Sequence, residues 1–107
     1  MRPKLLNKGQ IDDLMSSLPQ WQIDQQKRTI SVALKFANFK QAFAFMTEVA
    51  MHAERLDHHP DWSNSYHRLD IALSTHDVKG LTILDHQLAM AITDAASRYN
   101  ANYVTLR

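Results

Sequence analysis

Histidines and carboxylates gather in one stretch of the chain, between Glu54 and Asp77. His58 and His59 are adjacent, and His76 follows further along. An imidazole titrates close to neutral pH, so it can donate or accept a proton under physiological conditions. If the fold brings these side chains together, they would form a site suited to general acid–base catalysis.

Local structure predicts how the first two histidines are held. Pro60 disfavours helical geometry at the residue before it, so the preceding helix must end near residues 56–57. Adjacent residues in an extended segment point to opposite sides, so at most one of His58 and His59 need face a given pocket. Glu54 lies four residues before His58, within helical pairing distance. Glu54, Asp57 and the negative end of the helix dipole are expected to favour a protonated imidazole that can act as an acid.

Other polar and aromatic side chains flank the histidines. Thr75, His76 and Asp77 end a predicted strand, a place where functional side chains are often held on a rigid scaffold. Asp77 or Asp57 could orient an imidazole nitrogen, and Trp62 and Tyr66 could form an aromatic wall for a flat ligand. The residues that we expect to contact a substrate are Glu54, Asp57, Trp62, Thr75 and Asp77.

Two other interpretations of these side chains stay open. Many histidines are ordinary surface residues, which is our interpretation of His52, His67 and His86. From the residue pattern alone, His58, His59 and His76 are about as well explained as surface residues as they are as catalytic ones. Histidines with carboxylates also bind zinc or iron, but the sequence has no H-E-x-x-H or H-x-H spacing. We therefore expect no metal site.

Composition narrows the class of protein. The 107 residues have the length of one domain, so residues 1–107 are treated as a single domain. The formal net charge of +1 argues against a broad nucleic-acid-binding surface. There is no cysteine, so disulfides and thiolate nucleophiles are excluded. The first ten residues lack the apolar run of a signal peptide, and no run approaches the roughly 20 residues of a membrane span. These features predict a cytoplasmic protein that does not enter a membrane.

Hydrophobic spacing predicts three amphipathic helices. Asn7 with Gln10 resembles a capping box that opens a short first helix. Asn38 can cap a long second helix. Thr82 with Asp85 forms a second capping box, and the helix that follows is expected to end near residue 100.

Alternating apolar and polar residues predict strands between these helices. The clearest are residues 30–36 and 68–73, a shorter one is expected at 21–23, and the tail from residue 101 is ambiguous. Because helices cover the apolar face of a sheet, the predicted fold class is α+β, an antiparallel sheet with helices packed on one side. So small a sheet leaves two edges, which favours pairing with a second chain, so a homo-oligomer is expected.

Several segments resemble the pterin-4a-carbinolamine dehydratase family. They are AERLDHHPDWSNSY (53–66), LSTHD (73–77) and GLT (80–82), with LPQW (18–21) and FAFM (43–46) upstream. The pairing of HHP with THD is the specific part. The resemblance covers nearly the whole chain, apart from the first few residues and the tail after about Tyr99.

The resemblance implies a four-stranded antiparallel sheet with three helices on one face, and a tetramer built as a dimer of dimers. It also implies dehydration of a 4a-hydroxytetrahydropterin to quinonoid dihydropterin, which recycles the cofactor of the aromatic amino-acid hydroxylases. The residues carried over are His58, His59 and His76, with Glu54 close by. We expect His59 and His76 to flank the C4a hydroxyl, and His58 to contact the ring or act as the second proton carrier. The dehydration changes no oxidation level, so no metal or redox cofactor is expected.

Other functions compete with this one. Animal members of the family also act as dimerisation cofactors for a homeodomain transcription factor through a helix surface, so an interaction module is the second hypothesis. A pterin-binding scaffold without turnover is the third, and a metal-dependent enzyme is the fourth. The intact set of three histidines favours the dehydratase.

Overall fold

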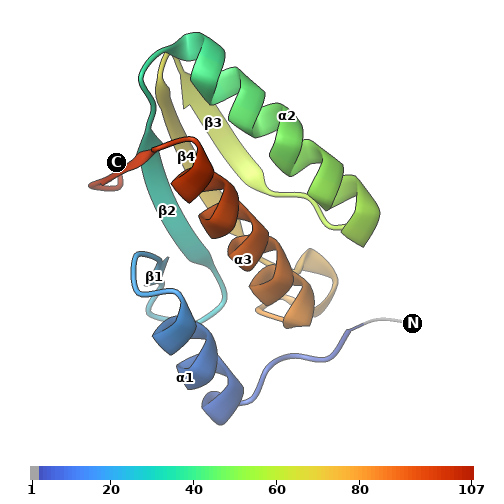
Figure 1. Cartoon of the computed structure of the whole chain (residues 1–107). Helices are drawn as coiled ribbons and strands as arrows, with labels where there is room; N and C mark the ends of the chain where they lie inside the picture. Colours follow the sequence, from blue (N-terminus) through green and yellow to red (C-terminus); the bar gives the residue numbers. More distant parts are fainter. Residues whose placement is uncertain (1–2) are drawn as a thin grey trace.

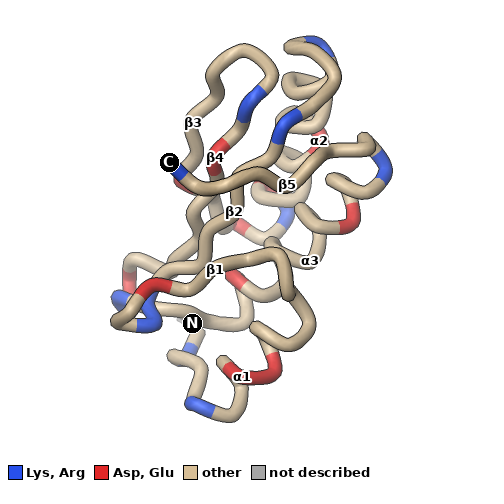
Figure 2. The backbone as a smooth tube through the Cα atoms, turned by 90° about the vertical axis from the view of Figure 1, so that its left-hand side faces the viewer, with Lys and Arg blue, Asp and Glu red and all other residues tan. Residues whose placement is uncertain are grey.

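Three α-helices pack against one face of an antiparallel sheet in the computed structural model, which describes residues 3–107 (Figure 1). In the view turned by 90°, the sheet lies on one side and the helices on the other (Figure 2). The elements in chain order are α1 (Lys8–Ser17), β1 (Gln22–Ile23), β2 (Ile30–Lys35), α2 (Phe39–Leu56), β3 (Asp61–Ser65), β4 (Arg68–Leu73), the short 3-10 helix η1 (His76–Val78), α3 (Ile83–Arg98) and β5 (Asn102–Val104). The predicted α+β fold class is confirmed.

The sheet follows the order β1-β2-β4-β3, and β5 pairs with β2 as well. β1 lies against the beginning of β2, while β5 pairs with its second half through Ala33↔Val104 and Lys35↔Asn102. The path of four strands is the one that the family resemblance implies. The ambiguous tail supplies a fifth, short strand.

The core lies between the helices and the inner face of β2 and β4. Apolar residues of these strands face one another in register, as in the pairs Val32↔Ile71 and Leu34↔Leu69, and all four of these side chains are buried. Phe45 of α2 inserts its ring into this core, and the centroids of the Phe45 and Phe36 rings are 4.9 Å apart. This alternation of inward and outward residues is the period-2 pattern that predicted the strands.

Capping interactions fix where the helices begin and end. Both predicted capping boxes are present, at the starts of α1 and α3, and the Asn38 side chain accepts a hydrogen bond from the Gln41 N–H at the start of α2. α2 ends at Leu56, and Asp57 follows with a left-handed backbone (φ 51°). The chain therefore turns sharply just before the two adjacent histidines.

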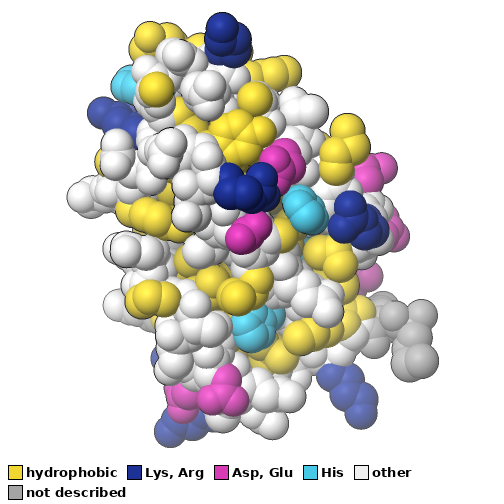
Figure 3. All heavy atoms as spheres, viewed as in Figure 1, with side chains coloured by type: hydrophobic (Ala, Val, Ile, Leu, Met, Phe, Trp, Pro, Cys, Tyr) yellow, Lys and Arg dark blue, Asp and Glu magenta, His cyan; other side chains and the backbone are white. Residues whose placement is uncertain are grey.

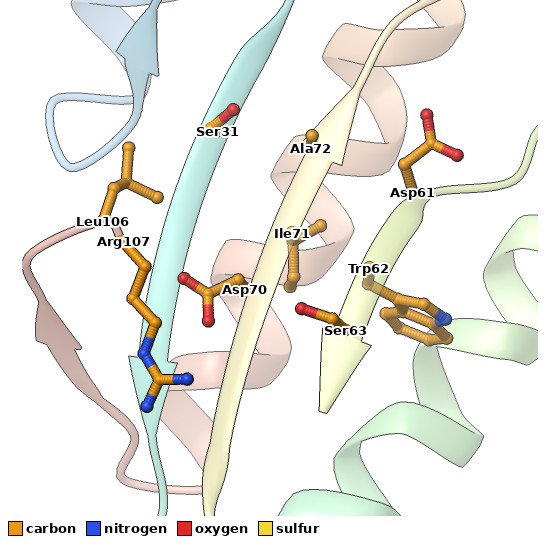
Figure 4. A pocket seen from close by; sticks show the side chains of 9 residues that line it. All are labelled: Ser31, Asp61, Trp62, Ser63, Asp70, Ile71, Ala72, Leu106 and Arg107. Carbon is orange, nitrogen blue, oxygen red and sulfur yellow. The ribbon is translucent and has the colours of Figure 1, made fainter. Parts of the chain in front are cut away.

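The outer face of the sheet is partly covered by the C-terminal tail. The Arg68 guanidinium donates to both carboxylate oxygens of Asp70, each at 2.9 Å, and to the Thr105 carbonyl at 2.7 Å. This hydrogen-bonded guanidinium holds the pKa of Asp70 below its usual value. Figure 4 shows Leu106 and Arg107 beside β2 on this face, with the Arg107 side chain near Asp70. Within residues 3–107, no helix is both long and apolar enough to cross a membrane.

Candidate active site

The hairpin of β3 and β4 brings the two histidine groups together. The chain leaves His58 and His59, runs along β3, and returns along antiparallel β4 to His76. An open cleft of about 1010 Å³ at this end of the molecule is lined by all three histidines. The residues around the cleft are Pro3, Leu56, Asp57, His58, His59, Ser74, Thr75, His76, Asp77 and Leu84.

His58 is the buried member of the cluster. Its Nε2 lies 2.6 Å from Oδ1 of Asp85, whose side chain has no exposed surface. The His58 N–H donates to the Ala53 carbonyl at 3.0 Å, because the left-handed Asp57 folds the chain back over the end of α2. Backbone and side chain of His58 are thus both fixed.

Asp85 is the centre of a buried polar network. Its Oδ2 accepts hydrogen bonds from the Thr75 hydroxyl at 2.7 Å and from the Thr82 N–H at 2.9 Å. The hydroxyls of Thr75 and Thr82 are 2.8 Å apart. One carboxylate therefore caps α3, holds the end of β4 and orients His58. A buried carboxylate with this many donors is stable in an apolar surrounding because its hydrogen-bonding capacity is used.

His59 lies on the other side of the backbone and is exposed, as the extended geometry predicts. Its Nε2 is 2.5 Å from Oε2 of Glu54. The pairing of Glu54 with His58 suggested by the i,i+4 spacing is therefore not the one observed. The helix ends before His58, so helical geometry no longer applies there and the next residue reaches Glu54 instead.

His76 is the first residue of η1, which follows β4 after Ser74 and Thr75. Its Nε2 lies 3.3 Å from Oδ2 of Asp61, the first residue of β3. The two side chains are largely exposed, at 78% for His76 and 71% for Asp61. The backbone around His76 is held by hydrogen bonds from Val78 N–H to the Thr75 carbonyl and from Lys79 N–H to the His76 carbonyl.

The other predicted contact residues lie in different places. Asp57, Thr75 and Asp77 line the cleft, and Glu54 is joined to it through His59. Trp62 is partly buried, packs against the core and is not among the described residues that line the cleft. Its ring points away from the outer face of the sheet (Figure 4). Tyr66 is exposed at the turn between β3 and β4 and does not line the cleft either.

Sequence reasoning missed two carboxylates of the site. Asp85 was assigned only a capping role, and Asp61 was assigned none. The sequence contained part of the information for Asp85. In a capping box, the side chain at the third helical position turns back towards the start of the helix, and the start of α3 is close to the cleft. Nothing in the local pattern of Asp61 indicates its partner, because the contact depends on how β3 and β4 pair.

The cleft has the parts needed to move protons at two or more points. Each histidine contacts one carboxylate through Nε2: His58 with Asp85, His59 with Glu54, and His76 with Asp61. A carboxylate on one ring nitrogen orients the imidazole and stabilises its protonated form. Within residues 3–107, no group of three or more His, Asp or Glu side chains is placed to hold a metal ion.

Comparison with known proteins decides the family. The family model described as pterin 4 alpha carbinolamine dehydratase matches residues 4–95. The chain belongs to this family. Two relatives with provisional pterin-4-alpha-carbinolamine dehydratase names are each 47% identical to it. The one from Rhizobium leguminosarum bv. trifolii aligns over 92% of this chain and 97% of the relative. The one from Prochlorococcus marinus aligns over 86% and 94%.

A solved structure supports the same assignment. The crystal structure titled transcriptional coactivator/pterin dehydratase from Brucella melitensis superimposes with a TM-score of 0.82 at 36% sequence identity. It covers 87% of this chain and 99% of that one. The pterin-4a-carbinolamine dehydratase resemblance seen in the HHP and THD segments is therefore confirmed, and with it the fold of the family.

Proposed function

We propose that this chain catalyses the dehydration after which its family is named, converting a 4a-hydroxytetrahydropterin to quinonoid dihydropterin and water. The observation that carries the proposal is the meeting of His58, His59 and His76 in one cleft, each against a carboxylate. Family membership supports the substrate class. The geometry supports the kind of chemistry.

The reaction needs two proton transfers. The substrate loses hydroxide from C4a, a poor leaving group, and a proton from the neighbouring ring nitrogen N5. An acid would protonate the departing oxygen, and a base would remove the nitrogen proton. Catalysis of this kind typically accelerates a reaction by roughly 10²–10⁴-fold. The carbon–oxygen bond breaks, its electron pair leaves with the oxygen as water, and the nitrogen lone pair forms the new double bond.

We assign His59 and His76 to the C4a hydroxyl, because both line the cleft and both are accessible to solvent and substrate. His58 is almost enclosed and firmly held by Asp85, so it suits contact with the pterin ring or the second proton transfer. Asp57, Thr75 and Asp77 are proposed substrate contacts at the cleft wall. None of these steps calls for a metal or a redox cofactor.

Stopped-flow absorbance of 4a-hydroxytetrahydropterin decay tests the proposal. Wild type should accelerate the loss of water, and His59→Ala and His76→Ala should each lower the rate constant by about 10²-fold or more. His86→Ala is the matched control, because His86 lies outside the cleft and contacts Ser17 on α1. No acceleration by wild type would refute the dehydratase. Unchanged turnover in both cleft variants would refute the assignment of roles.

We further propose that the protein acts as a homodimer or homotetramer. β3 pairs with β4 on one side and with no strand on the other within the described residues, so it offers an open edge. Phe39, Phe43 and Met51 expose apolar side chains on α2, and Figure 3 shows hydrophobic and charged side chains mixed across the helix face. Sedimentation analysis would decide the oligomeric state. A functional link to an aromatic amino-acid hydroxylase, which would supply the substrate, and cytoplasmic residence stay predictions.

A further inference from the structure

The three histidines of the cleft share a contact pattern but differ in how firmly they are held. The Nε2–carboxylate distance is 2.6 Å for His58, 2.5 Å for His59 and 3.3 Å for His76. His58 is enclosed by protein, whereas the side chain of His76 is 78% exposed. Packing therefore fixes the ring of His58 but leaves the ring of His76 to be oriented by polar contacts.

Asp61 is placed to provide that orientation. It pairs with Ala72 at the end of the hairpin where β3 begins and β4 ends, and His76 follows shortly after β4. Pro60 immediately precedes Asp61 and restricts the backbone there. Figure 4 shows the Asp61 carboxylate pointing away from Ser63 and Asp70, which lie further along the outer face of the sheet. The hairpin register thus sets the position of this carboxylate relative to η1.

We propose that Asp61 is a positioning residue for His76 in the dehydration. Its carboxylate Oδ2 lies 3.3 Å from Nε2 of His76, and we propose that this contact turns Nδ1 of the ring towards the substrate. The proposal rests on the proposed function for its chemistry and on the Asp61–His76 contact for its geometry. Asp61 itself does not line the cleft and need not touch the substrate.

The chemical consequence is a preferred state of the His76 ring. With Nε2 bound to the carboxylate, the neutral imidazole carries its proton on Nε2 and leaves Nδ1 as the proton acceptor. The same carboxylate stabilises the imidazolium when Nδ1 has taken a proton. The other titratable groups at the cleft are Asp57, His58, His59 and Asp77, and a substitution of Asp61 leaves all of them in place.

The expected effect is moderate because the pair is exposed to solvent. Exposed ion pairs contribute little, so Asp61→Asn should lower kcat by about two- to fivefold, with KM changed by less than about twofold. The limb of the activity profile that reports histidine protonation should move to lower pH in Asp61→Asn, because this variant lacks the carboxylate charge beside His76. Asp61→Glu keeps the charge and should restore most of kcat.

The experiment compares wild type with Asp61→Asn, Asp61→Glu and the control Asp13→Asn. Asp13 is an exposed carboxylate on α1 and is not among the residues around the cleft, so this control reports the loss of one surface charge. Stopped-flow rates are measured across pH. NMR chemical shifts of the His76 ring nitrogens report which nitrogen carries the proton, a second readout that does not depend on turnover. Urea unfolding checks that the variants are folded.

Support would be a lower kcat and a shifted pH profile in Asp61→Asn alone, with rescue in Asp61→Glu. The proposal is overturned if Asp61→Asn has the kcat and pH profile of Asp13→Asn. It is also overturned if the ring-nitrogen chemical shifts of His76 are the same in the two variants. If wild type shows no dehydration at all, the proposed function fails separately, and the ring-nitrogen chemical shifts alone decide whether Asp61 orients His76.

Discussion

Replacing Asp85 by asparagine should destabilise the protein strongly, although the two side chains have nearly the same shape. The carboxylate is fully buried and accepts hydrogen bonds from His58, Thr75 and Thr82, at 2.6, 2.7 and 2.9 Å. In asparagine, the negative charge is lost and one oxygen becomes an amino group, so the charged hydrogen bonds to Thr75 and Thr82 weaken and His58 keeps a partner only if its Nε2 is unprotonated. A hydrogen bond to a charged group contributes about 1.5–3 kcal/mol, and a buried donor left unsatisfied costs about 1–3 kcal/mol. We therefore expect the free energy of unfolding to fall by about 2–4 kcal/mol.

Urea unfolding of wild type, Asp85→Asn and Asp94→Asn measures this effect. Asp94 is on the same helix but is exposed, and its contact with Arg98 is an i,i+4 pair on the surface, so its loss should cost less than about 0.5 kcal/mol. If the two variants unfold at the same urea concentration with the same slope, the buried network around Asp85 does not stabilise the fold. Should Asp85→Asn fail to fold, Thr75→Val removes only one donor, and its expected cost is about 1 kcal/mol.

Three further predictions concern other parts of the fold. Because Arg68 lowers the pKa of Asp70 in the folded protein, this pair stabilises the fold above the unfolded pKa of about 4 and loses its contribution as pH falls through the lower folded value. Urea unfolding between neutral pH and about pH 3 should show the stability gap between wild type and Asp70→Asn closing as pH falls, and a constant gap would contradict the linkage. Phe45→Ala should cost about 3–5 kcal/mol in thermal or urea unfolding, since it opens a cavity in the core, and a cost below 1 kcal/mol would mean that the core repacks around the gap. Gly80→Ala would place its Cβ 2.6 Å from Cδ2 of Leu5, but that side chain is more than half exposed and can rotate, so a loss above about 1 kcal/mol would be unexpected.

Local signals in the sequence predicted the elements well. The capping boxes at Asn7 and Thr82 are present in the structure, and α2 ends just before His58 because Pro60 prevents its continuation. These features depend on neighbouring residues alone. Two strands were not predicted from alternation. The pattern left one or two strands open after the second helix and did not identify β3, and the three residues of β5 carry no clear alternation and are a strand only through pairing with β2.

The contacts within the site could be predicted only in part. The three histidines form one cluster because β3 and β4 make a hairpin, and neither the hairpin register nor the end at which the site lies is determined by residue spacing alone. The carboxylate that contacts each histidine was even harder to predict. Asp85 is far from His58 along the chain, and the Glu54 contact moved to His59 because of one left-handed residue, Asp57. Long-range pairing of this kind is a property of tertiary packing and not of local pattern.

The hairpin that joins the two halves of the cleft also determines where the chain can tolerate changes in length. Its tip, at Tyr66 and His67, lies at the opposite end of β3 and β4 from the cleft. Residues added at the tip would lengthen a loop and leave the paired strands as they are. One residue added inside β4 would shift the strand past its neighbours, reverse the faces of its side chains and displace His76 relative to His58. Natural or engineered insertions should therefore be accepted at the tip and rejected within the strands, so the tip is the place to graft a peptide or a fluorescent label without disturbing His58, His59 and His76.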